Sequence, residues 1–319
     1  MPAESSTPPK NNKRLGLALS AGAARGWAHI GVLQALEEID VKPDLIAGCS
    51  VGALVGGAYL CGALPAFERW ARELGPLSAI SAFSLAIGPG GLVNSAAAFE
   101  AFREYDCDIK DLPVEFAAVA ADLGTGEEIW LRDGSLVDAL RASSAIPVLF
   151  HAVRRDDRWL IDGAVANPTP VSLARTMGAD VVIAVDLNAV PRVLDRFNPP
   201  PPSVPAIIPA RQELEDASLT AAVRMFIADT QKRVRQGLSL AKARHLSKPQ
   251  LFETAYAAAD IFQMHLARAR LHAERPDILL TPDMRDAMPT SFDRADEFIE
   301  KGYLAVMNAA ADINALLDR

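Results

Sequence analysis

The sequence has little cysteine, no long apolar segment and no excess of basic residues. Its three cysteines, Cys49, Cys61 and Cys107, form no CxxC pair and cannot make an even disulfide framework, so a reducing compartment, the cytoplasm, is expected. The longest nearly apolar stretch, residues 51–64, is shorter than the roughly 20 residues that span a bilayer. We expect it to form a buried helix. Any contact with a membrane would then be peripheral.

Acidic residues outnumber basic ones. Lysine and arginine total 32 against 40 aspartate and glutamate residues, which gives a formal net charge of -8. Nucleic-acid binding needs a concentrated basic surface because the phosphate backbone is anionic. The balance therefore argues against nucleic acid as the main partner. Half of the 319 residues are hydrophobic, enough for a sizeable core in one large domain or in a domain with an appendage.

Short apolar segments alternate with stretches of helical periodicity over the first 190 residues. We expect strands at 14–19, 44–48, 115–121, 127–131, 158–161 and 181–187, and helices at 25–39, 51–62, 135–143 and 170–177. Strands that alternate with helices predict an α/β fold, in which a central, mostly parallel sheet is covered by helices on both faces.

The chain changes character after the last of these strands, where prolines crowd into a short segment. We expect a disordered tail at 1–13, a first domain at 14–190, a Pro-rich linker at 191–210 and a helical C-terminal region at 211–319. This region contains predicted helices at 219–246, 251–273 and 292–317 and one late strand at 277–280. If the late strand rejoins the sheet, the C-terminal region packs on the first domain.

A Gly-x-Ser-x-Gly pentapeptide, Gly48-Cys49-Ser50-Val51-Gly52, lies between a predicted strand and a predicted helix. That context favours a nucleophilic serine over a simple tight turn, because small neighbours let the chain turn sharply while the hydroxyl projects into a cleft. The helix that begins at Val51 also directs the positive end of its dipole at a developing oxyanion.

A second turn of small residues, 20–26, follows the first strand and opens the first helix. It lacks the glycine spacing of a dinucleotide loop and the Gly-Lys-Ser/Thr of a Walker-type phosphate loop. An oxyanion hole needs only free backbone N–H groups and close approach, which small residues allow. This turn is therefore the candidate oxyanion hole.

The pair Asp162-Gly163 ends a predicted strand and, taken alone, is more typical of a turn. However, the small-residue turn, the serine elbow, the block 141–147 and Asp162-Gly163-Ala164 occur in one order along the chain. Together they resemble the bacterial patatin-like phospholipases. The segments 20–33 and 276–302 are most similar to the RssA-type subgroup. The resemblance covers residues 14–319 and implies a patatin-like three-layer fold.

The resemblance implies a serine acyl hydrolase with a catalytic dyad. Ser50 would be the nucleophile, Asp162 its base, and the backbone at Gly22 and Ala23, helped by Arg25, the oxyanion hole. Gly48 and Gly52 would shape the elbow. A lipid or fatty-acyl ester would be the substrate, and no metal or organic cofactor is implied. The turn departs from the family's glycine-rich loop at residues 20, 21 and 23, where glycines are more usual.

Several alternatives stay open. Arg25 is equally well read as a structural arginine paired with a carboxylate at a sheet end. A Ser-His-Asp triad would depend on His151, since the other histidines fall in predicted helices. An acyltransferase, or a weakly active regulatory lipid-binding protein, would use the same residues. Cys49 is read as buried filler. The apolar segment 77–93, with glycine hinges, either covers the cleft or folds into the core.

Overall fold

The computed structural model describes residues 13–74, 99, 102–147, 150–188, 251–287 and 290–317. The chain divides into two units, residues 1–191 with 259–319, and residues 192–258. The first unit carries the sheet and the candidate site. Of the second unit, only the start of one helix, at 251–258, is described. The predictions for segment 77–93, linker 191–210 and helix 219–246 lie outside the described residues.

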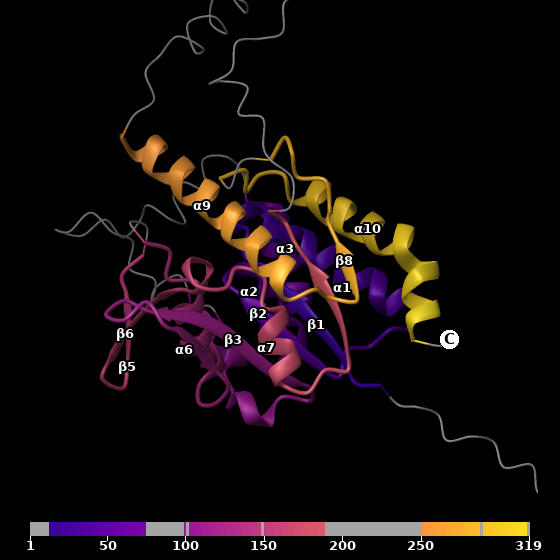
Figure 1. The fold of residues 1–319 in the computed structure, drawn as a ribbon, viewed down its shortest axis with the longest axis horizontal. Helices are drawn as coiled ribbons and strands as arrows, with labels where there is room; N and C mark the ends of the chain where they lie inside the picture. The colour runs from indigo at the N-terminus through magenta and orange to yellow at the C-terminus, as the bar shows by residue number, and fades with distance from the viewer. Residues whose placement is uncertain are drawn as a thin grey trace, which may run out of the picture. The chain divides into compact units, whose positions relative to one another are not determined.

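An eight-stranded sheet forms the centre of the first unit (Figure 1). Its strands are β1 (Leu15–Leu19), β2 (Leu45–Cys49), β3 (Glu115–Asp122), β4 (Glu128–Leu131), β5 (Val153–Arg155), β6 (Arg158–Asp162), β7 (Val181–Val185) and β8 (Ile278–Leu280). The order is β5-β6-β3-β2-β1-β7-β8, with β4 paired to β3. The run β3-β2-β1-β7-β8 is parallel, whereas β4, β5 and β6 pair antiparallel. The predicted α/β fold with a mostly parallel sheet is confirmed.

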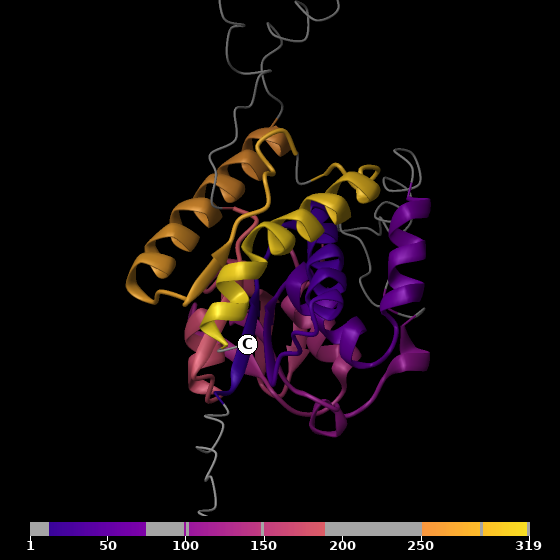
Figure 2. The ribbon, with the colours of Figure 1, turned by 90° about the vertical axis from the view of Figure 1, so that its right-hand side faces the viewer.

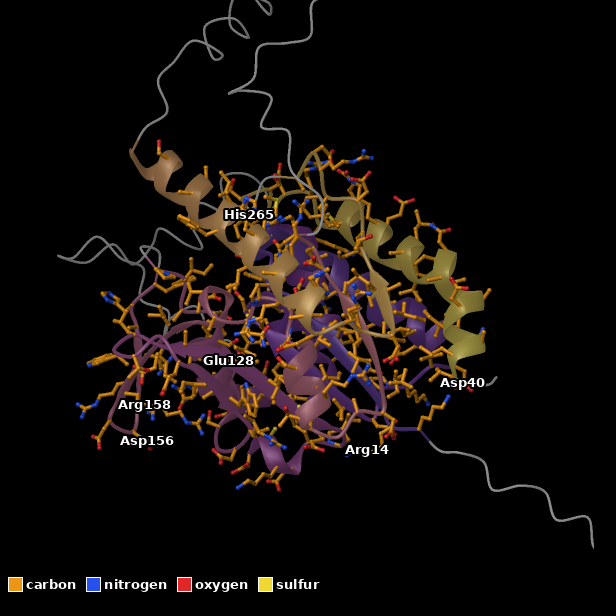
Figure 3. The ribbon with its side chains drawn as sticks, viewed as in Figure 1. Arg14, Asp40, Glu128, Asp156, Arg158 and His265 are labelled. Atoms are coloured by element: carbon orange, nitrogen blue, oxygen red, sulfur yellow. The ribbon has the colours of Figure 1, made fainter. Side chains whose placement is uncertain are left out.

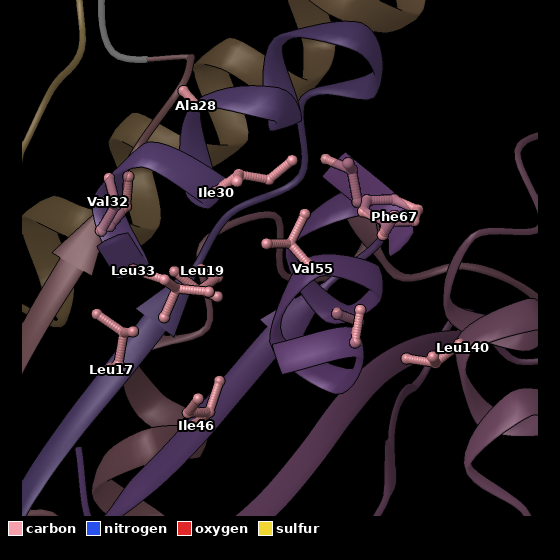
Figure 4. Packing of buried hydrophobic residues seen from close by; sticks show 14 of the residues in the cluster. Leu17, Leu19, Ala28, Ile30, Val32, Leu33, Ile46, Val55, Phe67 and Leu140 are labelled. Atoms are coloured by element: carbon pink, nitrogen blue, oxygen red, sulfur yellow. The ribbon is translucent and has the colours of Figure 1, made fainter. Parts of the chain in front are cut away.

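Helices cover both faces of this sheet. They are α1 (Ala28–Glu38), α2 (Val51–Leu60), α3 (Leu64–Glu73), α6 (Leu136–Ser143), α7 (Val171–Thr176), α9 (Leu251–Ala273) and α10 (Ala295–Leu316). One core cluster joins the sheet to α1, α2, α3, α6 and α10, and a second joins it to α7 and to Leu271 of α9. Figure 4 shows the first cluster, where Leu17 and Ile46 on the strands lie near Leu33 and Val55 on the helices. None of the described helices is both long and apolar enough to cross a membrane.

The described residues also include short 3₁₀ turns, which were not predicted from the sequence. They are η1 (Ala23–Trp27), η2 (Arg103–Tyr105), η3 (Ile109–Asp111) and η4 (Gly163–Val165). The helix expected at 25–39 begins as η1 and becomes α-helical only at Ala28. Helix α3 was not predicted, although its ten residues have an amphipathic pattern, and neither was strand β5, which has only three residues.

Helix α10 packs closely on α1 (Figure 2). A Cβ added to Gly31 would lie 1.8 Å from the Ile299 carbonyl oxygen, and one added to Gly302 would lie 1.9 Å from that of Ala28. Only glycine lets the two backbones approach this far. The helix that continues from the candidate oxyanion turn is thus packed against the last helix of the chain.

Candidate active site

The order of the strands brings the three predicted turns together. Strands β1 and β2 are parallel neighbours, so the turns that follow them meet at the same edge of the sheet. Cys49 pairs with Val119 of β3, and Asp162 pairs with the next residue, Ala120. Strand β4 pairs with both Val119 and Ala120 along one side of β3. Strands β2 and β6 therefore lie end to end along the other side of β3. Ser50 and Asp162 are therefore adjacent.

The elbow at Ser50 is shaped by backbone sterics. Ser50 has φ 54° and ψ -123°, a conformation that L-residues rarely adopt. A Cβ on Gly48 would lie 2.5 Å from Ala53 Cα, and one on Gly52 would lie 2.3 Å from the Leu19 carbonyl oxygen. A side chain at position 48 would collide with the start of α2, and one at position 52 would collide with the end of β1. Both positions therefore require glycine.

Ser50 and Asp162 form a buried hydrogen-bonded pair. The Ser50 hydroxyl donates to Asp162 Oδ2 at 2.6 Å, and the two residues are each 4% exposed. The other carboxylate oxygen, Oδ1, accepts the Ala164 N–H at 2.8 Å. Burial raises the pKa of Asp162 to about 6, against the opposing effect of these two hydrogen bonds. The carboxyl group is thus mostly ionised at pH 7 and can accept a proton.

Ser143, at the end of α6, holds the backbone of the elbow through hydrogen bonds. Its hydroxyl accepts the Ser50 N–H at 2.9 Å and donates to the Val119 carbonyl at 2.6 Å. The peptide group of the nucleophile is thereby tied to β3, on which Asp162 also pairs. Ser143 lies in the block 141–147 that resembles the family, but no role was predicted for it from the sequence. Nothing in the residues around Ser143 indicates this hydrogen bond.

The candidate oxyanion turn carries free backbone donors. In the hydrogen bonds made by the described residues, the N–H groups of Gly22 and Ala23 take no part. Ala23 has φ 50°, so the position where the family more usually has glycine does adopt the left-handed conformation, at a cost of about 1 kcal/mol. Alanine is tolerated there, and both amides remain available to an oxygen anion.

Three carbonyl groups of the same turn are each held by a side chain. The Ser20 carbonyl accepts from His29 Nε2 at 2.8 Å, that of Ala21 from Asn188 Nδ2 at 2.9 Å, and that of Gly22 from Arg25 Nε at 3.1 Å. These three side chains are almost fully buried. These side-chain donors therefore position the turn together with the backbone hydrogen bonds that the turn makes to neighbouring segments.

Arg25 contacts both the candidate oxyanion turn and a carboxylate. Besides the Gly22 carbonyl, its guanidinium donates to the Leu187 carbonyl at 3.2 Å and to Asp260 Oδ1 at 2.8 Å. The arginine is 3% exposed. It does have a carboxylate partner, but this partner lies on α9 and not at a sheet end. The ion pair and the contact with the turn exist together.

The histidines are placed away from the serine. Among the four that the structure describes, none hydrogen-bonds to Ser50 or Asp162. His151, His265 and His272 are exposed, and Figure 3 labels His265 on α9. Burial lowers the pKa of His29 to about 4, so its neutral ring donates through Nε2 to the Ser20 carbonyl. His245 lies outside the described residues.

The cysteines form no part of the pair. Cys49 is fully buried, and burial, with a smaller effect of the Asp162 charge, raises the pKa of its thiol well above the ordinary range. In the described ranges, no three His, Cys, Asp or Glu side chains come together as a metal site.

An apolar pocket lies between α2, α3 and α6. Its lining includes Leu54 and Ala58 of α2, Leu136 and Leu140 of α6, and Phe67 of α3. Ser50, Leu54 and Ala58 follow one another at four-residue steps and therefore lie along one side of α2. The pocket thus extends along the helix that begins at the candidate nucleophile.

Comparisons with known proteins extend this description. The family model described as patatin-like phospholipase matches residues 17–175. An NTE family protein of Mycobacterium tuberculosis is 38% identical over 180 residues, which cover 56% of this chain and 50% of that protein. The chain thus spans about half the length of this relative.

Two fungal relatives are larger still. Lysophospholipase nte1 of Emericella nidulans is 29% identical, and lysophospholipase NTE1 of Coccidioides immitis is 31% identical. Each match covers 56% of this chain and 12% of the relative. The solved structure of VipD from Legionella pneumophila is 13% identical and covers 96% of this chain and 67% of that one, with a TM-score of 0.41. Through residues 17–175, this chain belongs to the patatin-like phospholipase family.

Proposed function

We propose that this protein is a serine acyl hydrolase that cleaves carboxylic esters of lipids through a Ser50–Asp162 dyad. The observation that carries the proposal is the 2.6 Å hydrogen bond from the Ser50 hydroxyl to a buried carboxylate, beside free N–H groups at Gly22 and Ala23. Family membership of residues 17–175 and the lysophospholipase names of two relatives support a lipid substrate.

The reaction uses these groups in sequence. Asp162 accepts the hydroxyl proton as Ser50 Oγ attacks the ester carbonyl carbon, and the N–H groups of the turn bind the oxygen that becomes negative. When the C–O bond of the ester breaks, the leaving alcohol takes the proton from Asp162 and an acyl-serine remains. Water then attacks the acyl-serine, gives its proton to Asp162, and releases the fatty acid while Ser50 regains its hydrogen.

The decisive experiment removes each member of the dyad. Ser50→Ala, Asp162→Asn and the double variant should be similarly inactive on p-nitrophenyl esters, since both residues act in one step and their losses do not add. A fluorophosphonate probe should label the wild type at Ser50 and label Asp162→Asn far more slowly.

Two controls complete this experiment. Asp157→Asn changes a fully exposed aspartate on the neighbouring β5–β6 hairpin and should label at the wild-type rate. His151→Ala should retain substantial activity. If His151→Ala folds normally but is as inactive as Ser50→Ala, a histidine-dependent triad replaces the dyad.

The acyltransferase alternative concerns only the acceptor. An alcohol or thiol in place of water would take the acyl group from the same acyl-serine. Supplying glycerol, a lysophospholipid or a thiol and finding a new ester or thioester, with little free fatty acid, would favour it. A weakly active regulatory protein would instead bind lipid while turning over even short esters very slowly.

A further inference from the structure

Helix α9 places polar side chains against the turns on both sides of the candidate site. Asp260, Gln263 and Arg270 are separated by three and seven residues, with the fully buried Ala267 between the last two. This spacing puts all four on one stripe of the helix. Residues 259–273 belong to the same unit as the sheet, but they lie outside the part of the chain that the family model matches.

Two of these side chains reach the oxyanion turn through one intermediary each. Asp260 Oδ1 accepts from Arg25 Nη2 at 2.8 Å, and Arg25 Nε donates to the Gly22 carbonyl. Gln263 Nε2 donates to Asn188 Oδ1 at 3.2 Å, and Asn188 Nδ2 donates to the Ala21 carbonyl. Two parallel chains of hydrogen bonds thus run from α9 to two consecutive peptide groups of the turn.

The geometry of the peptide bond makes this arrangement specific. The carbonyl of one residue and the N–H of the next belong to one planar, trans group and point in opposite directions. A donor on the Ala21 carbonyl therefore aims the Gly22 N–H, and a donor on the Gly22 carbonyl aims the Ala23 N–H. These are the two amides that are free to bind an oxyanion.

Arg270 makes a separate contact with the turn that follows Asp162. Its Nη2 donates to the Ala166 carbonyl at 2.9 Å and to Glu128 Oε2 at 3.2 Å, and Glu128 Oε1 accepts from Asn167. Glu128 is labelled in Figure 3. Arg270 thus anchors α9 at a distance from the oxyanion turn, without touching Arg25 or Asn188.

We propose that Asp260 and Gln263 of α9, acting through Arg25 and Asn188, are positioning residues that aim the Gly22 and Ala23 N–H groups at the oxyanion. The inference rests on the proposed function, since it assigns these amides a role in ester cleavage. Helix α9 then completes the catalytic geometry from outside the family-matched domain. Asn188 and Asp260 do not touch the substrate themselves.

The test measures kcat and KM separately for a short p-nitrophenyl ester. Asp260→Asn removes the charge that holds Arg25, and Asn188→Asp replaces the donor to the Ala21 carbonyl with an oxygen. Each should lower kcat by about 10- to 100-fold and leave KM unchanged, which is less than the roughly 10²–10³-fold cost of deleting an oxyanion donor outright. Affinity for a trifluoromethyl ketone, which forms a tetrahedral adduct with Ser50, should fall in parallel.

Ala267→Gly is the control for a merely structural role. It weakens the same stripe of α9 between the two anchored ends without removing a hydrogen bond to the turn. Even if its melting temperature falls as much as that of Asp260→Asn, its kcat should stay near the wild-type value. Asp260→Glu, which retains the charge, should recover part of the activity lost in Asp260→Asn.

The outcomes separate the two proposals. If Asp260→Asn and Asn188→Asp lower kcat no more than Ala267→Gly, or raise KM instead, the positioning role is wrong while the hydrolase stands. If wild-type protein neither turns over short esters nor reacts with a fluorophosphonate, the proposed function fails first. A wild-type enzyme with the expected kcat losses and unchanged KM supports both.

Discussion

The nucleophile elbow and the oxyanion turn are neighbouring turns at one edge of the sheet, but they are held in different ways. At the elbow, backbone atoms pack so closely around Gly48 and Gly52 that a single added carbon would collide with them. At the oxyanion turn, the carbonyls are held by the side chains of His29, Asn188 and Arg25. The elbow depends on the absence of side chains at its two glycines, and the carbonyls of the turn depend on side-chain donors, one of which, Asn188, lies 167 positions away.

This difference accounts for an alanine at a left-handed position in the oxyanion turn and for glycine at both crowded positions of the elbow. The oxyanion turn contains alanine at a position with φ 50°, because the strain of about 1 kcal/mol is offset by side-chain hydrogen bonds that a buried carbonyl would otherwise lack. At the elbow, the limit at both glycines is van der Waals contact with neighbouring backbone atoms, which no hydrogen bond relieves. The two turns should therefore respond differently to the same chemical change.

The strongest test of this contrast is to add one carbon to the elbow. Gly52→Ala would place a Cβ 2.3 Å from the Leu19 carbonyl oxygen, so we expect a loss of about 3 kcal/mol in the free energy of unfolding and a collapse of activity. Chemical denaturation and ester turnover measure the two effects. Gly124→Ala, where the nearest atom is a side-chain oxygen at 3.3 Å, is the matched control. Normal activity in Gly52→Ala would remove the steric account.

A second prediction concerns the buried charge beside the elbow. Because burial raises the pKa of Asp162 to about 6, above the ~3.9 of an unfolded aspartate, its contribution to stability is fully present below pH 4 and is lost as pH rises through 6. Asp162→Asn keeps the hydrogen bonds to Ser50 and Ala164 but carries no charge. It should be inactive, yet more stable than wild type by about 1–3 kcal/mol at pH 8.

The same pKa sets the pH dependence of activity. Asp162 must be ionised to accept a proton, so turnover should fall as pH drops below about 6 and form a plateau above it. A break there lies close to the ~6.5 of free imidazole, so the pH profile alone does not distinguish a carboxylate base from a histidine. The stability difference between Asp162→Asn and wild type should shrink toward pH 4. A constant difference from pH 4 to 8 would contradict the raised pKa.

A third, smaller effect is expected at Arg25. Arg25→Lys keeps the charge near Asp260 but loses the Nε donor to the Gly22 carbonyl. Turnover of a short ester should fall by about tenfold, or ~1.4 kcal/mol in the transition state, with little change in the unfolding midpoint. Arg72→Lys, at a half-exposed ion pair on α3, serves as control. An unchanged turnover would limit Arg25 to a structural ion pair.

The smallest effect is expected when the oxyanion turn is made more like its family. Ala23→Gly relieves the strain of about 1 kcal/mol at φ 50° but increases the freedom of the unfolded chain, so the net gain in stability should be at most about 0.5 kcal/mol. Activity should be equal or slightly higher, because the flanking carbonyls stay held. A measured loss of stability would mean that alanine at this position is not strained.

Several parts of the fold and site were accessible from the sequence because they depend on residues close together in the chain. The alternation of strands and helices predicted the α/β fold, and the pentapeptide Gly48–Gly52 predicted a sharp strand-to-helix turn, since both follow from local periodicity and small side chains. The pairing of Ser50 with Asp162 came instead from a family resemblance, because 112 residues separate them and spacing alone does not indicate which strand ends meet.

Other parts escaped the sequence because their signals are weak or remote. Strand β5 has only three residues, and η1 replaces the first turn of a predicted helix. Asn188 follows a predicted buried strand, but nothing nearby identified it as a site residue or indicated the carbonyl it binds. Asp260 is an ordinary acidic residue of a predicted helix, 235 residues from Arg25. The roles of segment 77–93 stay predictions, outside the described residues.

The sequence by itself determined where the chain turns sharply and which residue types stand at those turns, because steric limits and hydrophobic periodicity act over a few residues. Only the tertiary structure decided which of these turns meet, which carbonyls each buried side chain binds, and that Asp162 has a raised pKa. Hydrogen-bond partners and burial depend on the register of β3 with β2 and β6 and on the packing of α9, and these contacts join residues about 70, 40 and 235 positions apart.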